Sequence, residues 1–420
     1  MNGLTGTLGA SLTAQPFDRL ARLLRARSHE RLGALAHGYL ELEDSCGIRA
    51  FGHRGADLHA RVRVTHPEFY FALAARGSVG AAEAYMAGAW DCDDLVALVR
   101  ILVRHRELLD GLEGGTARLG GWLLKAAHLF RRNTLAGSRR NIAAHYDLGN
   151  EFFRLFLSAD LMYSSALWED AVEDTLERAS ARKLERICRQ LELKPTDHVV
   201  ELGTGWGGFA LYAATHYRCR VTTTTVSREQ ASLAAARVQS AGLTERVTVL
   251  RADYRELAGR YDKLASIEMI EAIGEQYLET YFARLGQLLK PEGLALLQAI
   301  TIEDHRYAQA VRSVDFIKRH IFPGSFIPSI QAMLRAKTRA SDLALVQLED
   351  FGLSYARTLA AWRAAFLAHL DEVRALGFDE RFVRLWNFYF AYCEGGFRER
   401  SIGLAQLTFA RPAYRPSGTL

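Results

Sequence analysis

The sequence lacks any hydrophobic run long enough to cross a membrane. No stretch approaches the about eighteen apolar residues that a spanning helix requires. The first residues, MNGLTGTLGASLTAQPF, also lack the basic region followed by an apolar region that is typical of a secretory leader. We therefore expect a cytoplasmic protein.

Cysteine is scarce and scattered, and neither sign of charge dominates. The five cysteines in 420 residues form no CxxC pair, which excludes a zinc ribbon and favours free thiols in a reducing compartment. The formal net charge of +5 permits an anionic partner without identifying one, and we expect no nucleic acid and no resident metal. The length exceeds what one compact core accommodates, so we expect at least two domains.

We divide the chain into three parts. Residues 1–117 mix helical and strand-like patterns, which predicts a small α+β accessory domain. Residues 118–144 form a linker with six Lys or Arg and no Asp or Glu between Arg118 and Arg140, interleaved with aromatic residues and leucines. This composition suits the headgroup surface of a membrane, and a basic helix that packs on the next domain is the alternative. Residues 145–420 are the expected catalytic domain.

Strand-like and helical patterns alternate from about residue 180 onward. The segments that predict strands are HVVELGTG, CRVTTTTVS, RVTVLRADY, KLASIEMIEAI and LALLQAITI, with helical patterns between them. This alternation predicts an α/β fold with a doubly wound parallel sheet. Residues 303–375 are helical or irregular in pattern, and we expect them to form a cap over the carboxyl edge of that sheet.

A run of glycines follows the first of these strands, in VVELGTGWGG. Glycines there let the backbone turn sharply and approach a ligand, and the next helix offers free N–H groups. Gly203, Gly205 and Gly208 match a dinucleotide fingerprint, which alone is a weak signal. The following strand ends in VTTTTVS without an acidic residue for the ribose, and bulky Trp206 stands where a pyrophosphate would approach. Both features argue against NAD.

Two further features favour S-adenosylmethionine. Glu201 lies two residues before the first glycine, where its carboxylate suits the amino group of the methionine and the orientation of the loop. Asp253 and Tyr254 end the third strand in RADY, where they suit the amine and the ring of an adenine. A purely structural glycine turn in an unrelated α/β domain is the remaining interpretation.

Motifs along nearly the whole chain resemble the cyclopropane fatty acid synthase family, which includes the mycolic acid cyclopropane synthases. GSVGAAEAYMAGAWDCDDL resembles the N-terminal domain of the long bacterial synthases. HYDLGNEFFRLFL and MYSSALW resemble the segments that lead into the family's catalytic domain. ELGTGWGG, VSREQ, IEAIG, KPEG and GFRER then follow in family order. The resemblance implies a class I S-adenosylmethionine-dependent methyltransferase domain with a helical cap.

The resemblance also implies the reaction. A methyl group passes from S-adenosylmethionine to a cis double bond of a phospholipid acyl chain, and a bound bicarbonate then removes a proton so that a ring closes. Tyr355 and Glu271 match residues of the bicarbonate site. Cys393 matches a cysteine long treated as catalytic, but this chemistry needs no thiol nucleophile, so we expect a packing or pocket role for it. The residues expected at the cofactor are Tyr163, Ser164, Glu201, Gly203, Gly205, Trp206, Gly207, Thr225, Gln230, Asp253, Tyr254 and Ile267.

Four departures from the family pattern fall on the expected bicarbonate site. Ser165 replaces a cysteine, Gln298 replaces a histidine on a later strand, and Ala272 replaces the histidine after Glu271. Glu268 stands where the family has a glycine. The changes leave the cofactor loop intact, so bound bicarbonate is in doubt while the cofactor is not.

Two glutamates three residues apart, Glu268 and Glu271, stand among apolar residues in SIEMIEAIG. Carboxylates are rarely buried without a partner, and two close carboxylates repel, so we expect the pKa of one to rise. We predict that Glu268 supplies the proton-accepting carboxylate that bicarbonate supplies elsewhere, with Glu271 as its protonated or hydrogen-bonded supporter. The alternative is that Glu268 points into the cap and pairs with an arginine.

The leading interpretation is a lipid C-methyltransferase that works peripherally at the inner face of the membrane, on phospholipids with unsaturated acyl chains. The altered bicarbonate site favours a methyl-branched product over a cyclopropane. The alternatives are an NAD-dependent oxidoreductase and a lipid-binding paralogue without turnover. The cofactor that the protein retains would distinguish the oxidoreductase from the methyltransferase. The acyl chain, the double-bond position, the headgroup and a homodimer are left open.

Overall fold

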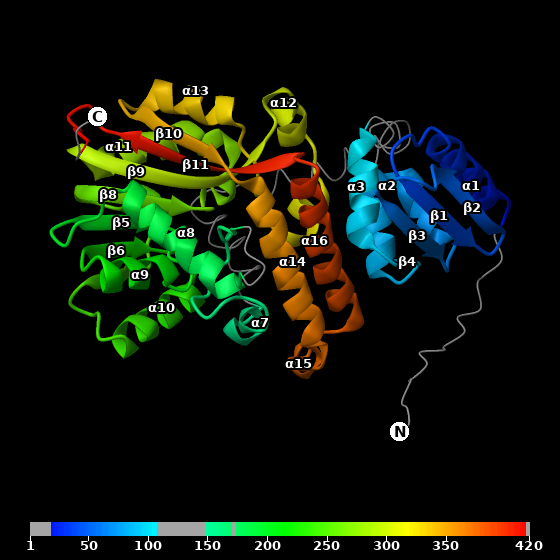
Figure 1. The fold of residues 1–420 in the computed structure, drawn as a ribbon, viewed down its shortest axis with the longest axis horizontal. Coiled ribbons are helices and arrows are strands. Elements are labelled where there is room, and N and C mark those ends of the chain that lie inside the picture. Colours follow the sequence, from blue (N-terminus) through cyan, green and yellow to red (C-terminus); the bar gives the residue numbers. More distant parts are fainter. Residues whose placement is uncertain (1–17, 107–147, 170–173, 417–420) are drawn as a thin grey trace. The chain divides into compact units, whose positions relative to one another are not determined.

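The computed structural model describes residues 18–106, 148–169 and 174–416 (Figure 1). The chain divides into two compact units, Met1–Gly120 with Glu380–Phe388, and Gly121–Asp379 with Tyr389–Leu420. The predicted linker, residues 118–144, lies outside the described residues. Among those that are described, no helix combines the length and the apolar character needed to cross a membrane.

The smaller unit is built on a four-stranded mixed sheet. Its elements are α1 (Arg19–Leu32), β1 (Tyr39–Asp44), β2 (Gly47–Gly52), β3 (His59–Val64), α2 (Glu68–Met86), β4 (Trp90–Cys92) and α3 (Leu95–Arg104). The strand order is β2-β1-β3-β4, with β1 and β3 parallel and the outer pairs antiparallel. Strand β3 alternates exposed and buried side chains because only one of its faces packs against helices. The mixed α+β character agrees with the sequence prediction.

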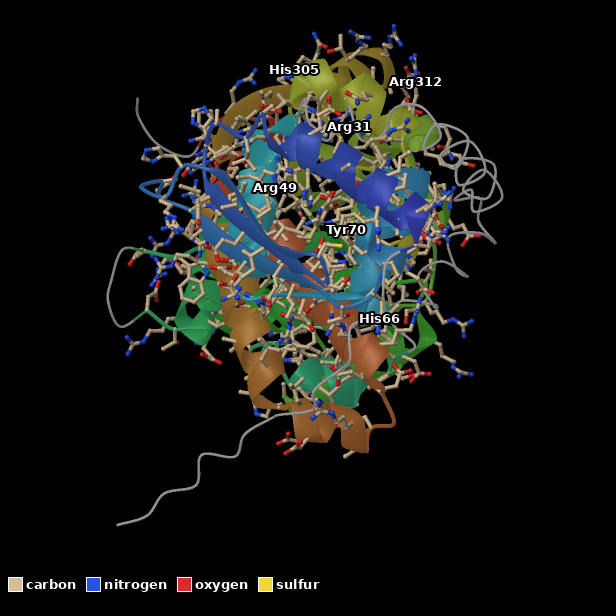
Figure 2. The ribbon with its side chains drawn as sticks, turned by 90° about the vertical axis from the view of Figure 1, so that its right-hand side faces the viewer. Arg31, Arg49, His66, Tyr70, His305 and Arg312 are labelled. Carbon is tan, nitrogen blue, oxygen red and sulfur yellow. The ribbon has the colours of Figure 1, made fainter. Side chains whose placement is uncertain are left out.

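A buried carboxylate ties the two long helices of this unit to the end of β1. Tyr70, labelled in Figure 2, donates from its hydroxyl to Asp44 at 2.7 Å. The Nε of Arg25 pairs with the same carboxylate oxygen at 2.5 Å. Burial of a charge is costly unless it is paired, so these two partners are what allow Asp44 to lie in the core.

The larger unit contains a seven-stranded sheet in the order β10-β11-β9-β8-β5-β6-β7. Its strands are β5 (His198–Leu202), β6 (Arg220–Thr224), β7 (Val247–Leu250), β8 (Tyr261–Ile267), β9 (Leu289–Ile302), β10 (Ala344–Asp350) and β11 (Ile402–Ala410). The strands from β7 to β9 run parallel, and β11 and β10 join antiparallel. The doubly wound sheet is therefore as predicted, with two antiparallel strands added at one edge.

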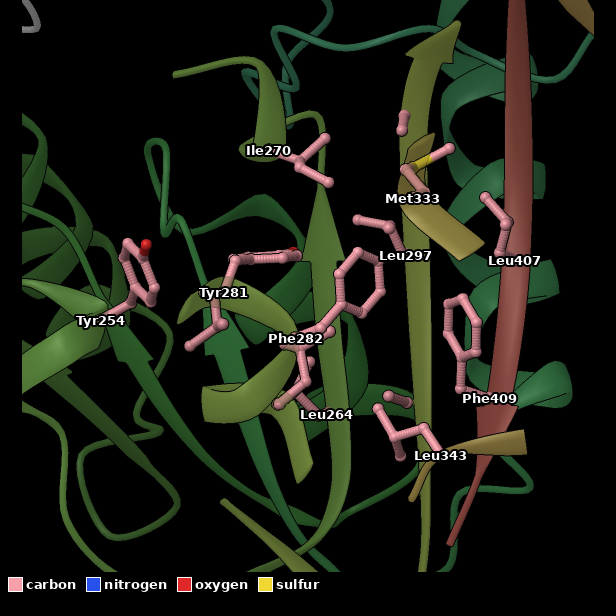
Figure 3. Packing of buried hydrophobic residues seen from close by; sticks show 14 of the residues in the cluster. Tyr254, Leu264, Ile270, Tyr281, Phe282, Leu297, Met333, Leu343, Leu407 and Phe409 are labelled. Carbon is pink, nitrogen blue, oxygen red and sulfur yellow. The ribbon is translucent and has the colours of Figure 1, made fainter. Parts of the chain in front are cut away.

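Helices cover both faces of this sheet. One face packs against α8 (Leu176–Gln190), α9 (Gly208–His216) and α10 (Arg228–Ser240), and the other against α11 (Leu278–Leu288) and α13 (Ile330–Ala340). Figure 3 shows Phe282 of α11 over the sheet between β8 and β9, and the centroid of its ring lies 5.7 Å from that of Phe409 on β11. Phe282 is fully buried, and burial of such a side chain contributes about 1.5–3 kcal/mol.

The remaining elements complete the larger unit. They are α7 (Asn150–Arg154), α12 (Asp304–Arg312), the π-helix η4 (Ile317–Ile321), α14 (Gly352–Ala368), α15 (Leu370–Ala375) and the last part of α16 (Glu380–Arg398). Within the range expected to be a helical cap, residues 344–350 instead form the edge strand β10. Most of the side chains of β10 are exposed, so its pattern lacks the apolar run by which the inner strands are recognised.

Strand β8 also ends earlier than the sequence pattern indicates. The strand stops at Ile267, and the short 3-10 helix η2 (Ile270–Ala272) follows. Glu268 has a positive φ of 50°, which breaks the strand immediately after its last paired residue. Both glutamates of SIEMIEAIG thus lie in the loop past the carboxyl end of β8.

Candidate active site

The glycine loop between β5 and α9 approaches an open space. Gly203, Gly205 and Gly207 have φ values of 94°, 52° and 87°, all in the region that disfavours other residues. A Cβ added to Gly205 would meet no atom within 4 Å. Gly207 is the N-cap of α9, so the loop ends where the helix offers its free N–H groups.

A cavity of about 150 Å³ lies in front of this loop. Eleven of the twelve residues that the sequence assigns to the cofactor line it, and Gly207 is the exception. These eleven are Tyr163, Ser164, Glu201, Gly203, Gly205, Trp206, Thr225, Gln230, Asp253, Tyr254 and Ile267. Glu268 and Met269 also line the cavity, so the loop after β8 forms one of its walls.

A buried carboxylate forms the floor of the cavity. Glu201 on β5 accepts a hydrogen bond of 2.6 Å from the hydroxyl of Thr223, its register partner on β6. Burial raises the pKa of Glu201 to about 8, and the Thr223 hydrogen bond and the charge of Lys183 only partly counteract this. A buried carboxylate of this kind gains most from an ammonium ligand, which fits the amino group of a methionine.

Two neutral side chains line the cavity where the sequence predicts the ribose. Thr225, just after β6, donates to Gln230 of α10 at 2.8 Å, and both line the cavity. The side chains together offer neutral donor and acceptor groups where dinucleotide folds place an acidic residue. They suit ribose hydroxyls without the selectivity that a carboxylate would impose.

Asp253 and Tyr254 line the other end of the cavity. Asp253 caps the 3-10 helix η1 (Tyr254–Glu256), and each of its oxygens accepts a hydrogen bond of 2.8 Å from Arg255. Asp253 also accepts from the backbone N–H of Arg255 at 3.0 Å, so its carboxylate is fixed at this end of the cavity. The buried hydroxyl of Tyr254 has no hydrogen-bond partner among the described residues. An aromatic face with these polar groups fits an adenine.

Glu268 occupies the centre of the expected bicarbonate site. Its Oε1 accepts from the backbone N–H of Ser165 at 2.9 Å and from the amide of Gln298 at 2.7 Å. Its Oε2 accepts from the hydroxyl of Tyr355, on α14, at 2.7 Å. Burial raises the pKa of Glu268, while these three donors and the charge of Lys183 act to lower it. The carboxylate is therefore held by the residues that the sequence associates with bound bicarbonate.

Glu271 has a different environment three residues later. Its Oε1 accepts from the backbone N–H of Ile300 at 2.6 Å, and its buried Oε2 has no partner among the residues that the structure describes. Burial, followed by the charge of Glu268, raises the pKa of Glu271 to about 8. The two environments separate the protonation states, because Glu268 has three donors and Glu271 has one. At neutral pH Glu271 is mainly protonated and Glu268 is the better candidate for the ionised carboxylate.

An aromatic cluster adjoins the cavity at Tyr163. The ring of Tyr163 lies 5.3 Å from that of Trp362 and 5.4 Å from that of Phe153, and its hydroxyl lies 3.1 Å from that of Tyr389. The ring of Phe322 completes the cluster at 6.3 Å. These apolar faces exclude water from one wall of the cavity and can contact a hydrocarbon chain.

Cys393 lies on α16 in surroundings that oppose a thiolate. Burial raises the pKa of the Cys393 thiol above its ordinary value, and the charge of Asp315 adds to this effect. Among the residues that the structure describes, no positive charge lowers the pKa of this thiol, whereas reactive thiols commonly lie beside one. These surroundings disfavour a nucleophilic thiolate, and the packing or pocket role of Cys393 stays a prediction.

Two buried polar residues at this site escape a motif-based search. Lys183 of α8 is fully buried and donates to the hydroxyl of Ser164 at 2.9 Å, and burial lowers its pKa to about 8. Gln406 of β11 is also buried and donates to Gln298. The available signal was the helical period, because Lys183 shares the buried stripe of α8 with Leu184 and Ile187.

Comparisons with known proteins agree with this geometry. The family model described as mycolic acid cyclopropane synthetase matches residues 134–407. Tuberculostearic acid methyltransferase UfaA1 of Mycobacterium tuberculosis is 36% identical over 345 residues, 80% of this chain and 79% of the relative. Cyclopropane-fatty-acyl-phospholipid synthase of Escherichia coli is 36% identical over 379 residues, 88% of this chain and 92% of the relative.

A solved structure resembles the larger part of the chain. Mycolic acid cyclopropane synthase CmaA1, complexed with SAH and CTAB, superposes with a TM-score of 0.60 and 28% identity. The superposition covers 65% of this chain and 98% of that one. The predicted fold class and enzyme type, an S-adenosylmethionine-dependent lipid methyltransferase, are confirmed, and the NAD-dependent and non-catalytic alternatives find no support. The chain belongs to the mycolic acid cyclopropane synthetase family.

Proposed function

We propose that this enzyme methylates the double bond of an unsaturated acyl chain in a membrane phospholipid, with Glu268 in place of bicarbonate as the proton acceptor. The names of the relatives support the acyl substrate, since one is a fatty-acyl-phospholipid synthase and another a tuberculostearic acid methyltransferase. The observation that carries the role of Glu268 is its carboxylate, held by the donors of Ser165, Gln298 and Tyr355.

The site residues prepare the reaction chiefly by alignment. S-adenosylmethionine, when bound, supplies an electrophilic methyl group. The glycine loop and Glu201 would hold it in the cavity, and the aromatic cluster around Tyr163 would exclude water from the reacting carbons. No base is needed for this first bond, so the site requires only one proton acceptor.

Glu268 acts after the new carbon–carbon bond has formed. The π electrons of the alkene form that bond to the methyl carbon, while the sulfur–methyl bond breaks and its electron pair stays on the departing sulfur. A positive charge is left on the neighbouring carbon of the acyl chain. Glu268 then accepts one proton, and the electron pair of the broken C–H bond neutralises the charge. Loss from the new methyl group closes a cyclopropane, and loss from an adjacent carbon gives a methyl-branched alkene.

We favour the methyl-branched product for this chain. A carboxylate fixed to the backbone at Glu268 reaches fewer hydrogens of the cation than a small ion, so its position selects which proton leaves. Ser165 and Gln298, which replace the ion-binding cysteine and histidine of the family pattern, hold this fixed carboxylate instead. The relative named for tuberculostearic acid accords with a branched product. The cyclopropane synthase of Escherichia coli has the same sequence identity to this chain, 36%, so identity alone does not select the product.

The test is lipid mass spectrometry in a host that makes cis-unsaturated phospholipids. Expression of the enzyme should add the mass of one methylene group to unsaturated acyl chains, and mild hydrogenation should then add two hydrogens to the branched alkene. The purified enzyme should work equally well in carbonate-free buffer. Strong stimulation by added bicarbonate, or unchanged lipids despite tight S-adenosylmethionine binding, would refute the proposal.

The same function places the enzyme at a membrane surface. The acyl chain must leave the bilayer to reach Glu268, while no described helix is suited to span the bilayer. The basic residues of the linker are suited to anionic headgroups, although they lie outside the described residues. We propose peripheral binding driven by these charges.

A further inference from the structure

A row of buried polar side chains leads from Glu268 to the rim of the larger unit. The amide nitrogen of Gln298 donates to Glu268 at 2.7 Å, and the amide oxygen of Gln298 accepts from Gln406 at 2.9 Å. The amide oxygen of Gln406 in turn accepts from Nε of Arg186 at 3.0 Å. Arg186, on α8, also pairs with Glu349 of β10. Four elements, β9, β11, α8 and β10, therefore contribute to one row.

The backbone fixes the middle of this row. Gln298 on β9 and Gln406 on β11 are direct register partners in the antiparallel ladder, and both are almost fully buried. Side chains of directly opposed residues lie close enough to bond across the strands. The two amides therefore face one another whatever the end groups do, and only their direction remains to be set.

Arg186 sets that direction. An amide accepts at one end and donates at the other, whereas a guanidinium only donates. Gln406 must consequently turn its oxygen toward Arg186 and its nitrogen toward Gln298. Gln298 must then turn its own nitrogen toward Glu268. If Arg186 were absent, both amides could reverse together and present a carbonyl oxygen to the carboxylate.

We propose that Arg186 is a positioning residue which, through Gln406 and Gln298, ensures that an N–H group rather than an oxygen faces Glu268. This inference rests on the proposed function, because it concerns the residue proposed as the proton acceptor. An N–H donor stabilises the ionised carboxylate that can accept a proton, and an oxygen stabilises the protonated acid that cannot. The row thus selects the active protonation state.

Other titratable groups act on the same carboxylate. They come from α14, α8, η2 and α16, and they are Tyr355, Lys183, Glu271 and Tyr389. Their influence does not pass through Gln298. A substitution at Arg186 or Gln406 therefore changes the pKa of Glu268 only while Gln298 is present. Comparing its effect with and without Gln298 tests the proposal.

The first measurement is the pH dependence of turnover. Gln406→Glu keeps an acceptor for Arg186 but removes the donor to Gln298, so the amide of Gln298 should reverse. The acid limb of the profile should move upward by roughly one to two pH units, with turnover approaching the wild-type plateau at high pH. Arg186→Gln, which leaves the direction unset, should move it in the same sense by a smaller amount.

A double-mutant cycle separates the row from a simple change of charge. In a Gln298→Leu background, both shifts should fall to a small remainder, because only the through-space effect survives. Thr408→Val on β11 and Arg189→Gln on α8 are matched controls that should leave the limb unmoved. Shifts of equal size with and without Gln298, or no shift in a folded variant, would overturn the proposal.

A second readout keeps this inference distinct from the proposed function. Infrared titration of the resting enzyme, with Glu268→Gln as the subtraction reference, reports protonation of Glu268 without any turnover. The carboxyl band should titrate at higher pH in Gln406→Glu. If it does while Glu268→Gln retains near-normal turnover, the row is correct and the role of Glu268 as base is wrong. An unmoved band refutes the row whatever the activity.

Discussion

Glu268 has a backbone conformation that glycine adopts more readily than any other residue. Its φ of 50° lies in the left-handed region, which costs about 1–2 kcal/mol for a residue with a Cβ. The resemblance places a glycine at this position in the family, so the backbone geometry is explained by the family pattern and the carboxylate is the addition. Three hydrogen bonds to the side chain offset this strain. A strained residue that its surroundings stabilise in this way is typical of a functional site.

Matched variants of the two glutamates distinguish the base from its neighbour. Glu268→Gln should lower turnover by roughly 10²–10⁴-fold, the range for a positioned base, and leave S-adenosylmethionine affinity intact. Glu271→Gln should retain most turnover, because the pKa of about 8 already keeps Glu271 mainly protonated at neutral pH. Single-turnover kinetics and calorimetry at pH 7 measure both effects.

The pH dependence of turnover is a second test of Glu268 as the proton acceptor. Turnover should fall as pH decreases through the raised pKa of Glu268, since the protonated acid cannot accept a proton. In Glu271→Gln this limb should stay close to its wild-type position, because a pKa of about 8 already keeps Glu271 mainly protonated, and therefore uncharged, at lower pH. Equal losses in the two variants, or a limb that stays in Glu268→Gln, would contradict the assignment.

Cys393 tests whether a nucleophile is needed. Cys393→Ser should keep a substantial part of wild-type turnover, because the methyl group passes directly to the alkene and burial keeps the thiol neutral. The measurement is kcat on lipid vesicles, accompanied by the thermal unfolding temperature. A folded variant that binds S-adenosylmethionine and yet shows no turnover would mean that the thiol has a chemical role.

At the scale of elements, the glycine loop is the feature that creates the cofactor site. Gly205 and Gly242 form a matched pair, since both have positive φ values, 52° and 67°, and both would direct a Cβ into open space. Of these two glycines, Gly205 lines the cavity and Gly242 does not. Gly205→Val should therefore abolish S-adenosylmethionine binding, whereas Gly242→Val should retain it at a similar cost in stability. Calorimetry and thermal unfolding of the two proteins report these outcomes, and equal affinities would refute the site.

The sequence predicted those elements whose patterns are local. The loop from Gly203 to Gly208, the inner strands and the two glutamates all follow from periodicity and short motifs, and the structure brings them to one cavity. The end of β8 at Ile267 was not predictable, because apolar residues continue beyond it. The row from Arg186 to Gln298 was also missed, since it depends on strand pairing between residues 108 positions apart.

At the scale of the whole molecule, the division of the chain does not follow its linear order. Residues 380–388 of α16 belong to the smaller unit, whose other residues are 1–120. Arg384 explains this, because its guanidinium donates to the backbone oxygen of Trp90, pairs with Asp91 and lies 4.0 Å from the ring of Tyr85. No composition shift marks this return, so the sequence predicted a continuous domain from residue 145.

Membrane attachment is a property of the whole molecule that charge should control. The enzyme should sediment with anionic vesicles at low salt and much less with neutral ones, and the difference should vanish as salt shortens the Debye length. A variant in which glutamine replaces five linker residues should sediment less with anionic vesicles. These residues are Lys125, Arg131, Arg132, Arg139 and Arg140. A control variant in which glutamine replaces four exposed arginines elsewhere should sediment like the wild type. These arginines are Arg189, Arg228, Arg339 and Arg374. Turnover on vesicles should follow sedimentation, because the acyl chain reaches Glu268 only from a bound membrane. Equal binding to neutral and anionic vesicles at low salt would instead assign attachment to apolar contacts.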